Sequence, residues 1–134
     1  MHVLIVEDDL DLQFSLVDLL GKSGYAVQAV GDGLSALEKL EGADVLLADI
    51  GIPGMDGLEL CSEARSHYPY VNVILMTGCD SPLSRSEASC RGAELYLTKP
   101  FDTEVLLAHL RRFEGSLRAA TEAGPQRIQV MEGR

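Results

Sequence analysis

The sequence predicts an α/β fold: a doubly wound, five-stranded parallel sheet with five helices. Three observations support this fold class. Short apolar segments alternate strictly with segments of helical periodicity along the chain. The apolar segments are almost continuously hydrophobic, which is typical of strands covered on both faces. Right-handed crossovers then place helices on both sides of an open sheet, for which we expect the strand order 2-1-3-4-5.

Five apolar segments are predicted as strands. The first four are short runs of mainly Val, Leu, Ile and Ala, and the fifth is the shorter run ELYLT, in contrast to the helical spacing of the segments around them. In chain order, the predicted strands are residues 2–6, 25–30, 44–49, 71–77 and 94–98.

The segments that follow the strands are predicted as helices. Apolar residues recur with helical spacing over residues 9–20. Asp56, Ser81 and Asp102 suit the N-terminal caps of the third, fourth and fifth helices, and Gly42 closes the second. In chain order, the helices are expected at residues 9–20, 34–40, from about 57, from about 82, and 102–113.

Composition excludes several kinds of function. The chain has 11 basic and 21 acidic residues, which give a formal net charge of −10. Direct binding to nucleic acid needs cations that neutralise phosphates, so we expect none, and anionic membrane surfaces are disfavoured too. The sequence has neither a signal peptide nor an apolar stretch long enough to span a bilayer. These features predict a cytoplasmic protein.

The length of 134 residues is enough for one domain. We expect that domain to cover residues 1–114. Residues 115–134 include a stretch of small and polar residues with a Gly-Pro pair, which is typical of a linker. Within this tail, residues 127–134 alternate weakly and suggest the first strand of a further domain.

Chemically active side chains follow the predicted strands at the points where the strands end. Glu7 and Asp8 follow the first strand, Asp49 ends the third, Thr77 ends the fourth, and Lys99 follows the fifth. The carboxyl ends of the strands of a doubly wound sheet meet at one edge, where such folds place their sites. We therefore expect these five side chains to converge.

Crowded carboxylates resist joint ionisation, and a hard cation relieves this repulsion. Mg²⁺ prefers oxygen ligands and retains several waters, so one or two carboxylates suffice to hold it. Asp8 and Asp49 are candidate ligands, with the backbone carbonyl of Gly51 as a further oxygen and Glu7 acting through a water. The open positions of such a metal would accept a phosphoryl group.

Each of these residues also has an ordinary explanation when it is considered alone. Asp8 or Asp9 would cap a helix, Asp49 would cap a turn, Thr77 would end a strand, and Lys99 would be a solvated surface charge. These explanations fail jointly, because separate strands bring these residue types to one edge.

The stretches VLIVEDD, DVLLADIGIPGMDGLEL, VILMTG and GAELYLTKPF resemble the response-regulator receiver domain of bacterial two-component signalling. The resemblance covers residues 1–114 and implies a flavodoxin-like, CheY-like fold. It implies that Asp49 accepts a phosphoryl group from a histidine kinase or a histidine phosphotransfer protein. It further implies that Glu7 and Asp8 hold Mg²⁺ and that Lys99, followed by a cis peptide bond, contacts the acyl phosphate.

The same resemblance makes Thr77 the switch hydroxyl and Tyr96 the switch aromatic. We expect Tyr96 to move inward on phosphorylation, from a half-buried position with its hydroxyl in water. The fourth helix has few large apolar residues and is expected to be the least anchored. The resemblance also suggests a homodimer through the fourth helix, fifth strand and fifth helix, but Leu95 replaces an acid that would pair with Arg111.

Two other functions are compatible with this fold class. An Mg²⁺-dependent phosphohydrolase with an aspartyl nucleophile would commonly need a second acid at the position of Gly51, and a substrate cap. A flavin-binding module would need an anion-binding first loop, whereas the loop here is acidic. The preferred prediction is a signalling module rather than a conventional enzyme. Its output is either a winged-helix DNA-binding domain of a transcription factor or the action of a stand-alone regulator.

Overall fold

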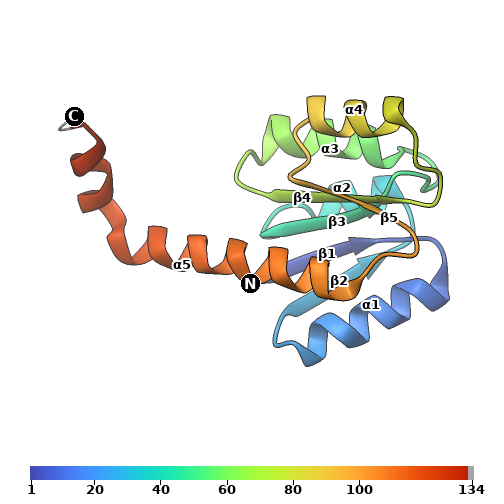
Figure 1. Cartoon of the computed structure of the whole chain (residues 1–134), viewed down its shortest axis with the longest axis horizontal. Coiled ribbons are helices and arrows are strands. Elements are labelled where there is room, and N and C mark those ends of the chain that lie inside the picture. The colour runs from blue at the N-terminus through green and yellow to red at the C-terminus, as the bar shows by residue number, and fades with distance from the viewer. Residues whose placement is uncertain (133–134) are drawn as a thin grey trace. The chain divides into compact units, whose positions relative to one another are not determined.

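The computed structural model describes residues 1–132, and the side chains of residues 1–119. The chain divides into two units, Met1–Pro100 and the segment from Phe101 onward. The first unit contains the five strands and the first four helices in strict alternation, and the second contains a single helix (Figure 1). The predicted order of strands and helices is therefore confirmed.

The elements of the first unit begin and end close to the predicted residues. They are β1 His2–Val6, α1 Leu10–Lys22, β2 Ala26–Val30, α2 Gly33–Lys39, β3 Val45–Asp49, α3 Gly57–His67, β4 Asn72–Thr77, α4 Pro82–Cys90 and β5 Leu95–Thr98.

The five strands form one parallel sheet in the order β2-β1-β3-β4-β5, as predicted. The central register is given by Val6, which pairs with Val30 on one side and with Ala48 on the other. Ala48 in turn pairs with Leu75. Because Glu7 and Asp49 each come one residue after this row, the register brings them to the same level at the carboxyl edge of the sheet.

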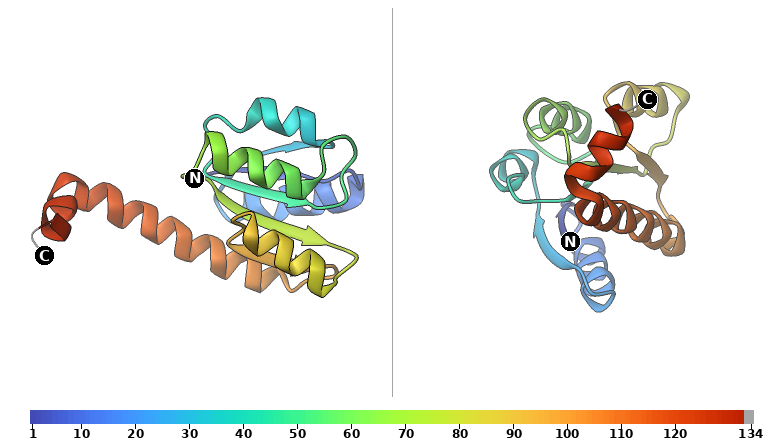
Figure 2. Two further views of the ribbon diagram at one scale, coloured as in Figure 1. Left: turned by 90° about the horizontal axis from the view of Figure 1, so that it is seen from above. Right: turned by 90° about the vertical axis from the view of Figure 1, so that its left-hand side faces the viewer.

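Both faces of the sheet are covered, which explains why the strands are almost continuously apolar. Figure 1 and the right-hand view of Figure 2 together show α1 on one side of the sheet and α2, α3 and α4 on the other. Every residue of β3 and β4 is buried. The core beneath α2, α3 and α4 includes Leu4, Leu46 and Leu75 from the strands, with Ala36, Leu60, Ala64 and Ala88 from the helices.

The helices of the first unit begin at capping side chains. The carboxylate of Asp9 accepts hydrogen bonds from the backbone amides of Asp11 and Leu12. Asp56 caps α3, and Ser81 caps α4. Each cap satisfies amide groups that have no partner within the helix. The predictions for these caps are confirmed.

Arg65 of α3 fixes the loops that lead into β4 and β5. Its guanidinium donates to the carbonyl oxygens of Pro69, Val71 and Gly92, and it forms an ion pair with Glu94. The Glu94 carboxylate also accepts from the amide of Val73 at 2.6 Å. These bonds position the start of β5, the strand that carries Tyr96 and leads to Lys99.

The second unit is the helix α5, Thr103–Glu132. Asp102 precedes it and accepts from the amide of Glu104 at 2.9 Å, so this cap is confirmed. The expected end of the helix near residue 113 is wrong, as is the strand suggested from residue 127, because the backbone remains helical to Glu132. Residues 116–123 include three Ala with Leu, Arg and Glu, which favour a helix, and the backbone stays helical through Gly115, Gly124 and Pro125. Residues 133 and 134 lie outside the described residues.

Candidate functional site

The polar residues predicted at the strand ends lie at the carboxyl edge of the sheet. Glu7 and Asp8 directly follow β1, Asp49 is the last residue of β3, and Thr77 is the last residue of β4. Lys99 follows β5, whose Thr98 pairs with Thr77. The parallel arrangement therefore gathers residues that are as far apart in sequence as 7 and 99.

Three of these residues form an acidic cluster. One carboxylate oxygen from each of Glu7, Asp8 and Asp49 lies within 4.8 Å of the other two. Glu7 is completely buried and Asp49 is 8% exposed, whereas Asp8 is open to solvent. The cluster thus has a buried floor and one accessible carboxylate.

Lys99 bridges the two buried acids of this cluster. Its Nζ atom donates to Oδ2 of Asp49 at 2.5 Å and to Oε1 of Glu7 at 2.6 Å. The remaining Glu7 oxygen accepts from the amide of Asp9 at 3.1 Å. One ammonium therefore offsets part of the repulsion between two carboxylates that share a site.

The environment changes the ionisation of Glu7 and Lys99 in specific ways. Burial raises the pKa of Glu7, and the nearby charge of Asp49 adds to this, although hydrogen bonds from Lys99 and Asp9 act against it. For Lys99, burial by itself lowers the pKa, but the hydrogen bonds to Asp49 and Glu7 outweigh burial, so the pKa is raised. Lys99 consequently keeps its positive charge at neutral pH.

Backbone contacts orient Asp49. The amide of Gly51 donates to Oδ1 of Asp49 at 2.8 Å, so the second carboxylate oxygen is left to Lys99. Gly57, at the start of α3, packs directly on the backbone of Asp49 and Ile50, where a Cβ would clash. Gly54 has a φ of +76°, which a side chain would strain. The loop after Asp49 is therefore tight because it must fold back against the strand.

The donor set of this cluster suits a hard divalent cation. Carboxylate oxygens are the ligands that Mg²⁺ prefers, and the cation requires few of them because it retains waters. The exposed carboxylate of Asp8 faces solvent, from which a hydrated ion would arrive. The observed clustering of Glu7, Asp8 and Asp49 thus fits the predicted ligand set.

Thr77 is 5% exposed, and its hydroxyl is engaged by its own loop. Its Oγ1 atom accepts from the amide of Cys79 at 3.0 Å. The side chain thereby links the end of β4 to the loop that precedes α4.

Tyr96 is half-buried on β5, but its hydroxyl is not left to water as expected. The phenolic oxygen lies 3.1 Å from Oδ1 of Asp80 and 3.2 Å from Oγ of Ser84. Asp80 also accepts from Arg85 at 2.5 Å, and the Arg85 guanidinium lies 5.4 Å from the centre of the Tyr96 ring. The expectation was wrong because the hydroxyl reaches residues of the α4 entry that only the tertiary structure brings near.

Polar contacts also anchor the far end of α4. Ala88 is the only buried residue of this helix, as its sparse apolar content predicted. Arg91, which follows the helix, donates to Glu87, to Ser62 and to the carbonyl oxygen of Leu58. Through Ser62 and Leu58, Arg91 therefore ties the end of α4 to α3.

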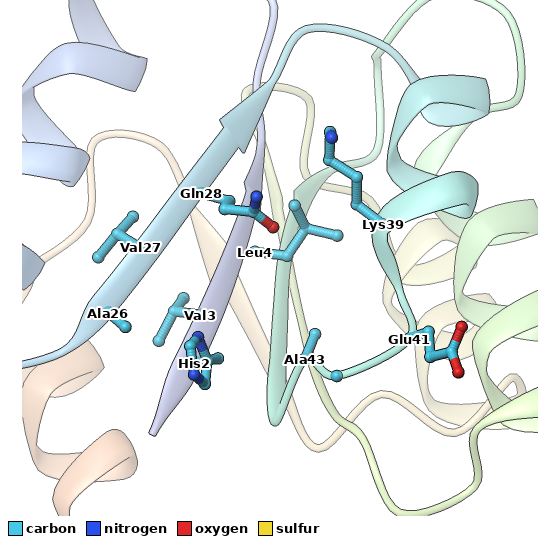
Figure 3. A pocket seen from close by; sticks show the side chains of 10 residues that line it. His2, Val3, Leu4, Ala26, Val27, Gln28, Lys39, Glu41 and Ala43 are labelled. Atoms are coloured by element: carbon cyan, nitrogen blue, oxygen red, sulfur yellow. The ribbon is translucent and has the colours of Figure 1, made fainter.

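A separate hollow lies at the opposite, amino-terminal end of the strands. It has a volume of about 430 Å³ and is bordered by the start of β1, the start of β2 and the turn between α2 and β3. Figure 3 shows Leu4 and Ala43 at its lining, with Gln28, Lys39 and Glu41 around it. None of the residues predicted to act chemically lines this hollow.

Among the described residues, no helix has the length and apolar character needed to cross a membrane.

Comparison with known proteins identifies relatives of this arrangement. Residues 3–111 match the family described as the response regulator receiver domain. The chain is 38% identical to the sensory transduction protein RegX3 of Mycolicibacterium smegmatis, over 96% of this chain and 60% of that protein. It is 36% identical to the two-component response regulator PhoP of Pseudomonas aeruginosa, over 93% of this chain and 58% of that protein.

Solved structures show the same fold. The BeF3-activated N-terminal receiver domain of Klebsiella pneumoniae RstA aligns with a TM-score of 0.79 and 32% identity, covering 84% of this chain and 97% of that structure. The chain itself spans about three-fifths of the length of RegX3 and PhoP.

Proposed function

The chain belongs to the response regulator receiver family, and we propose that Asp49 is its phosphoacceptor. The phosphoryl donor would be a histidine kinase or a histidine phosphotransfer protein. The observation that carries this proposal is the position of Asp49, at the end of a buried strand, beside two further carboxylates and in contact with the Lys99 ammonium. Phosphoryl transfer depends mainly on such positioning and on charge neutralisation.

The residues of the site have distinct roles in this proposal. An oxygen of Asp49 attacks phosphorus while the bond from phosphorus to the donor breaks, and Gly51 holds the other oxygen through its amide. Lys99 contacts the phosphoryl oxygens as it now contacts Asp49. Asp8, Asp49 and the carbonyl of Gly51 would hold Mg²⁺, with Glu7 acting through a water. The ion supplies positive charge beside the phosphoryl oxygens.

Phosphorylation then changes the surface formed by Thr77 and Tyr96. The aspartate gains only about one unit of negative charge, but its new oxygens reach further. A hydrogen bond from the Thr77 hydroxyl to a charged group is worth about 1.5–3 kcal/mol, whereas inverting a 1:99 equilibrium takes about 5.5 kcal/mol. Thr77 therefore acts together with Lys99 and with an inward movement of Tyr96.

The protein acts as a switch, with self-catalysed phosphoryl transfer and hydrolysis as its only chemistry. A phosphohydrolase is less well supported, because the position two residues after Asp49 is Gly51 rather than an acid. We place the receiver in residues 1–114 and treat residues 115–134 as a connecting segment. The net charge of −10 argues against direct binding of nucleic acid by this domain, and we expect it to act in the cytoplasm.

The output follows one of two routes. The chain spans about three-fifths of RegX3 and PhoP. This favours an output through a further domain, such as the winged-helix DNA-binding domain of a transcription factor. The other route is a stand-alone regulator. A homodimer through α4, β5 and α5 would serve either route, although Arg111 lies 3.7 Å from Glu104 of its own helix.

Incubation of the chain with Mg²⁺ and acetyl phosphate tests the phosphoacceptor. We expect the intact mass to rise by one phosphoryl group, and Asp49→Asn to abolish this gain. Asp44→Asn is the matched control, because Asp44 precedes the same strand at its opposite end. Unchanged labelling of Asp49→Asn would assign the phosphoryl group to another residue.

The variant Thr77→Ala tests the switch. If phosphorylation no longer moves the Tyr96 side chain in this variant, the proposed role of Thr77 is supported. If Tyr96 moves as fully as in wild type, that role is contradicted.

A further inference from the structure

The contacts of Tyr96 with α4 form a polar cluster that the proposed phosphoryl chemistry does not require. Its members are Asp80, Ser84, Arg85 and Tyr96, which we call the α4 latch. The Tyr96 hydroxyl is within hydrogen-bond distance of both Asp80 and Ser84. A phenol has one proton, which serves one of these two acceptors at a time, so the hydroxyl stays either on the loop before α4, through Asp80, or on the first turn of α4, through Ser84.

Arg85 contacts two members of this cluster, the carboxylate of Asp80 and the ring of Tyr96. It forms an ion pair with Asp80 at 2.5 Å and lies 5.4 Å from the centre of the Tyr96 ring, within the range of a cation–π contact. The hydrogen bond from Arg85 lowers the pKa of Asp80, so its carboxylate is ionised at neutral pH. Tyr96 is therefore held at its hydroxyl and on its ring face.

The latch is connected to Thr77 through a very short piece of chain. The Thr77 hydroxyl accepts from the amide of Cys79, the residue directly before Asp80. If the Thr77 hydroxyl turns away toward a phosphoryl group, the Cys79 amide loses this acceptor. The loop that positions Asp80 is then released at the moment when Thr77 changes partner.

We propose that the α4 latch is an inhibitory contact that holds Tyr96 against α4 and opposes the change to the phosphorylated arrangement. This inference rests on the proposed function, because it assumes that Tyr96 moves. The far end of α4 is held separately by Arg91, through Glu87, Ser62 and Leu58. Release of the latch therefore frees the N-terminal end of α4 while Arg91 keeps the other end on α3.

The test uses the full chain with Mg²⁺ and beryllofluoride as the probe. The variant Asp80→Ala/Ser84→Ala removes both partners of the Tyr96 hydroxyl but leaves the tyrosine and the acidic cluster intact. Arg91→Ala is the matched control, since it loosens the opposite end of the same helix. The readouts are the ring resonance of Tyr96, identified by its loss in Tyr96→Phe, and the concentration of beryllofluoride that gives half saturation.

We expect the double variant to bind beryllofluoride about fivefold more tightly than wild type, the effect of about one net hydrogen bond. Its Tyr96 resonance without the probe should shift toward the wild-type position with the probe, and Arg91→Ala should show neither effect. If the probe moves Tyr96 in wild type while the double variant matches wild type in both readouts, the latch is wrong and the switch remains. If the probe never moves Tyr96 in wild type, the proposed switch fails and the latch fails with it.

Discussion

Gly57, the first residue of α3, lies so close to Asp49 that a Cβ on Gly57 would come 2.5 Å from the Asp49 carbonyl oxygen. Real Cβ atoms do not approach a backbone atom this closely, so either the helix or the strand would have to shift. The residue that begins α3 is therefore coupled sterically to the position of the proposed phosphoacceptor.

The first prediction is that Gly57→Ala destabilises the protein, although alanine favours helices. Overpacking against a buried backbone costs about 1–3 kcal/mol, which exceeds the gain of about 1 kcal/mol from helix propensity. Urea unfolding measures the difference. Gly21→Ala is the control, because a Cβ at Gly21 in α1 meets nothing within 4 Å, and it should be neutral or stabilising. Equal stability of both variants would contradict the proposed steric coupling.

The second prediction concerns Lys99, which contacts two acids. Lys99→Met should lower the free energy of unfolding in Mg²⁺-free buffer by about 2 kcal/mol, since a hydrogen bond to a charged group contributes about 1.5–3 kcal/mol. Added Mg²⁺ should restore part of the loss by supplying positive charge. Lys22→Met serves as the control, because its ion pair with Asp18 is exposed and worth under about 1 kcal/mol. A loss in Lys99→Met no larger than the control's would be evidence against the bridge.

The third prediction is a pH dependence that arises from Glu7. Its pKa in the folded protein is raised above the ordinary value of 4.5, first by burial. The folded state therefore binds the proton more tightly than the unfolded state. The stability that the folded state gains from binding this proton on Glu7 is complete below pH 4.5. It is lost as the pH rises through the raised pKa of Glu7.

Glu7→Gln removes the titration of Glu7. The stability of this variant should therefore change less between pH 4.5 and neutrality than the stability of wild type does. In Mg²⁺-free buffer, the stability of Glu7→Gln relative to wild type should increase as the pH rises from 4.5 toward neutrality. Thermal unfolding across this range, with Glu41→Gln at an exposed position as the control, measures the difference. A constant difference between Glu7→Gln and wild type over the whole range would contradict the assignment.

The fourth prediction concerns binding of Mg²⁺ to the acidic cluster. A ligand that binds only the folded state stabilises it by about 2.7 kcal/mol at one hundred times its Kd, so Mg²⁺ should raise the Tm of wild type. Asp8→Asn should greatly reduce this rise. Asp11→Asn, an exposed acid in the first turn of α1, should leave the rise intact. An identical Mg²⁺ response in the two variants would place the ion elsewhere.

The fold and the acidic cluster could be predicted from local patterns. Continuous apolar runs indicated buried parallel strands, and parallel strands bring their carboxyl ends to one edge. Glu7, Asp49 and Lys99 could therefore be placed together from their positions alone. The arrangement of parallel strands determines the edge of the sheet at which a residue lies, and applying it requires no knowledge of side-chain contacts.

What the sequence determined by itself was the alternation of elements, their caps, and the edge at which Glu7, Asp8, Asp49 and Lys99 meet. Only the tertiary structure decided that Tyr96 contacts Asp80 and Ser84, and that Arg91 reaches Leu58, 33 residues away. The continuation of α5 to Glu132 was also missed, because the glycines and proline of the tail indicated a break. The physical reason is that hydrophobic periodicity reports burial along one element, whereas a polar contact between two elements depends on their distance and orientation in space.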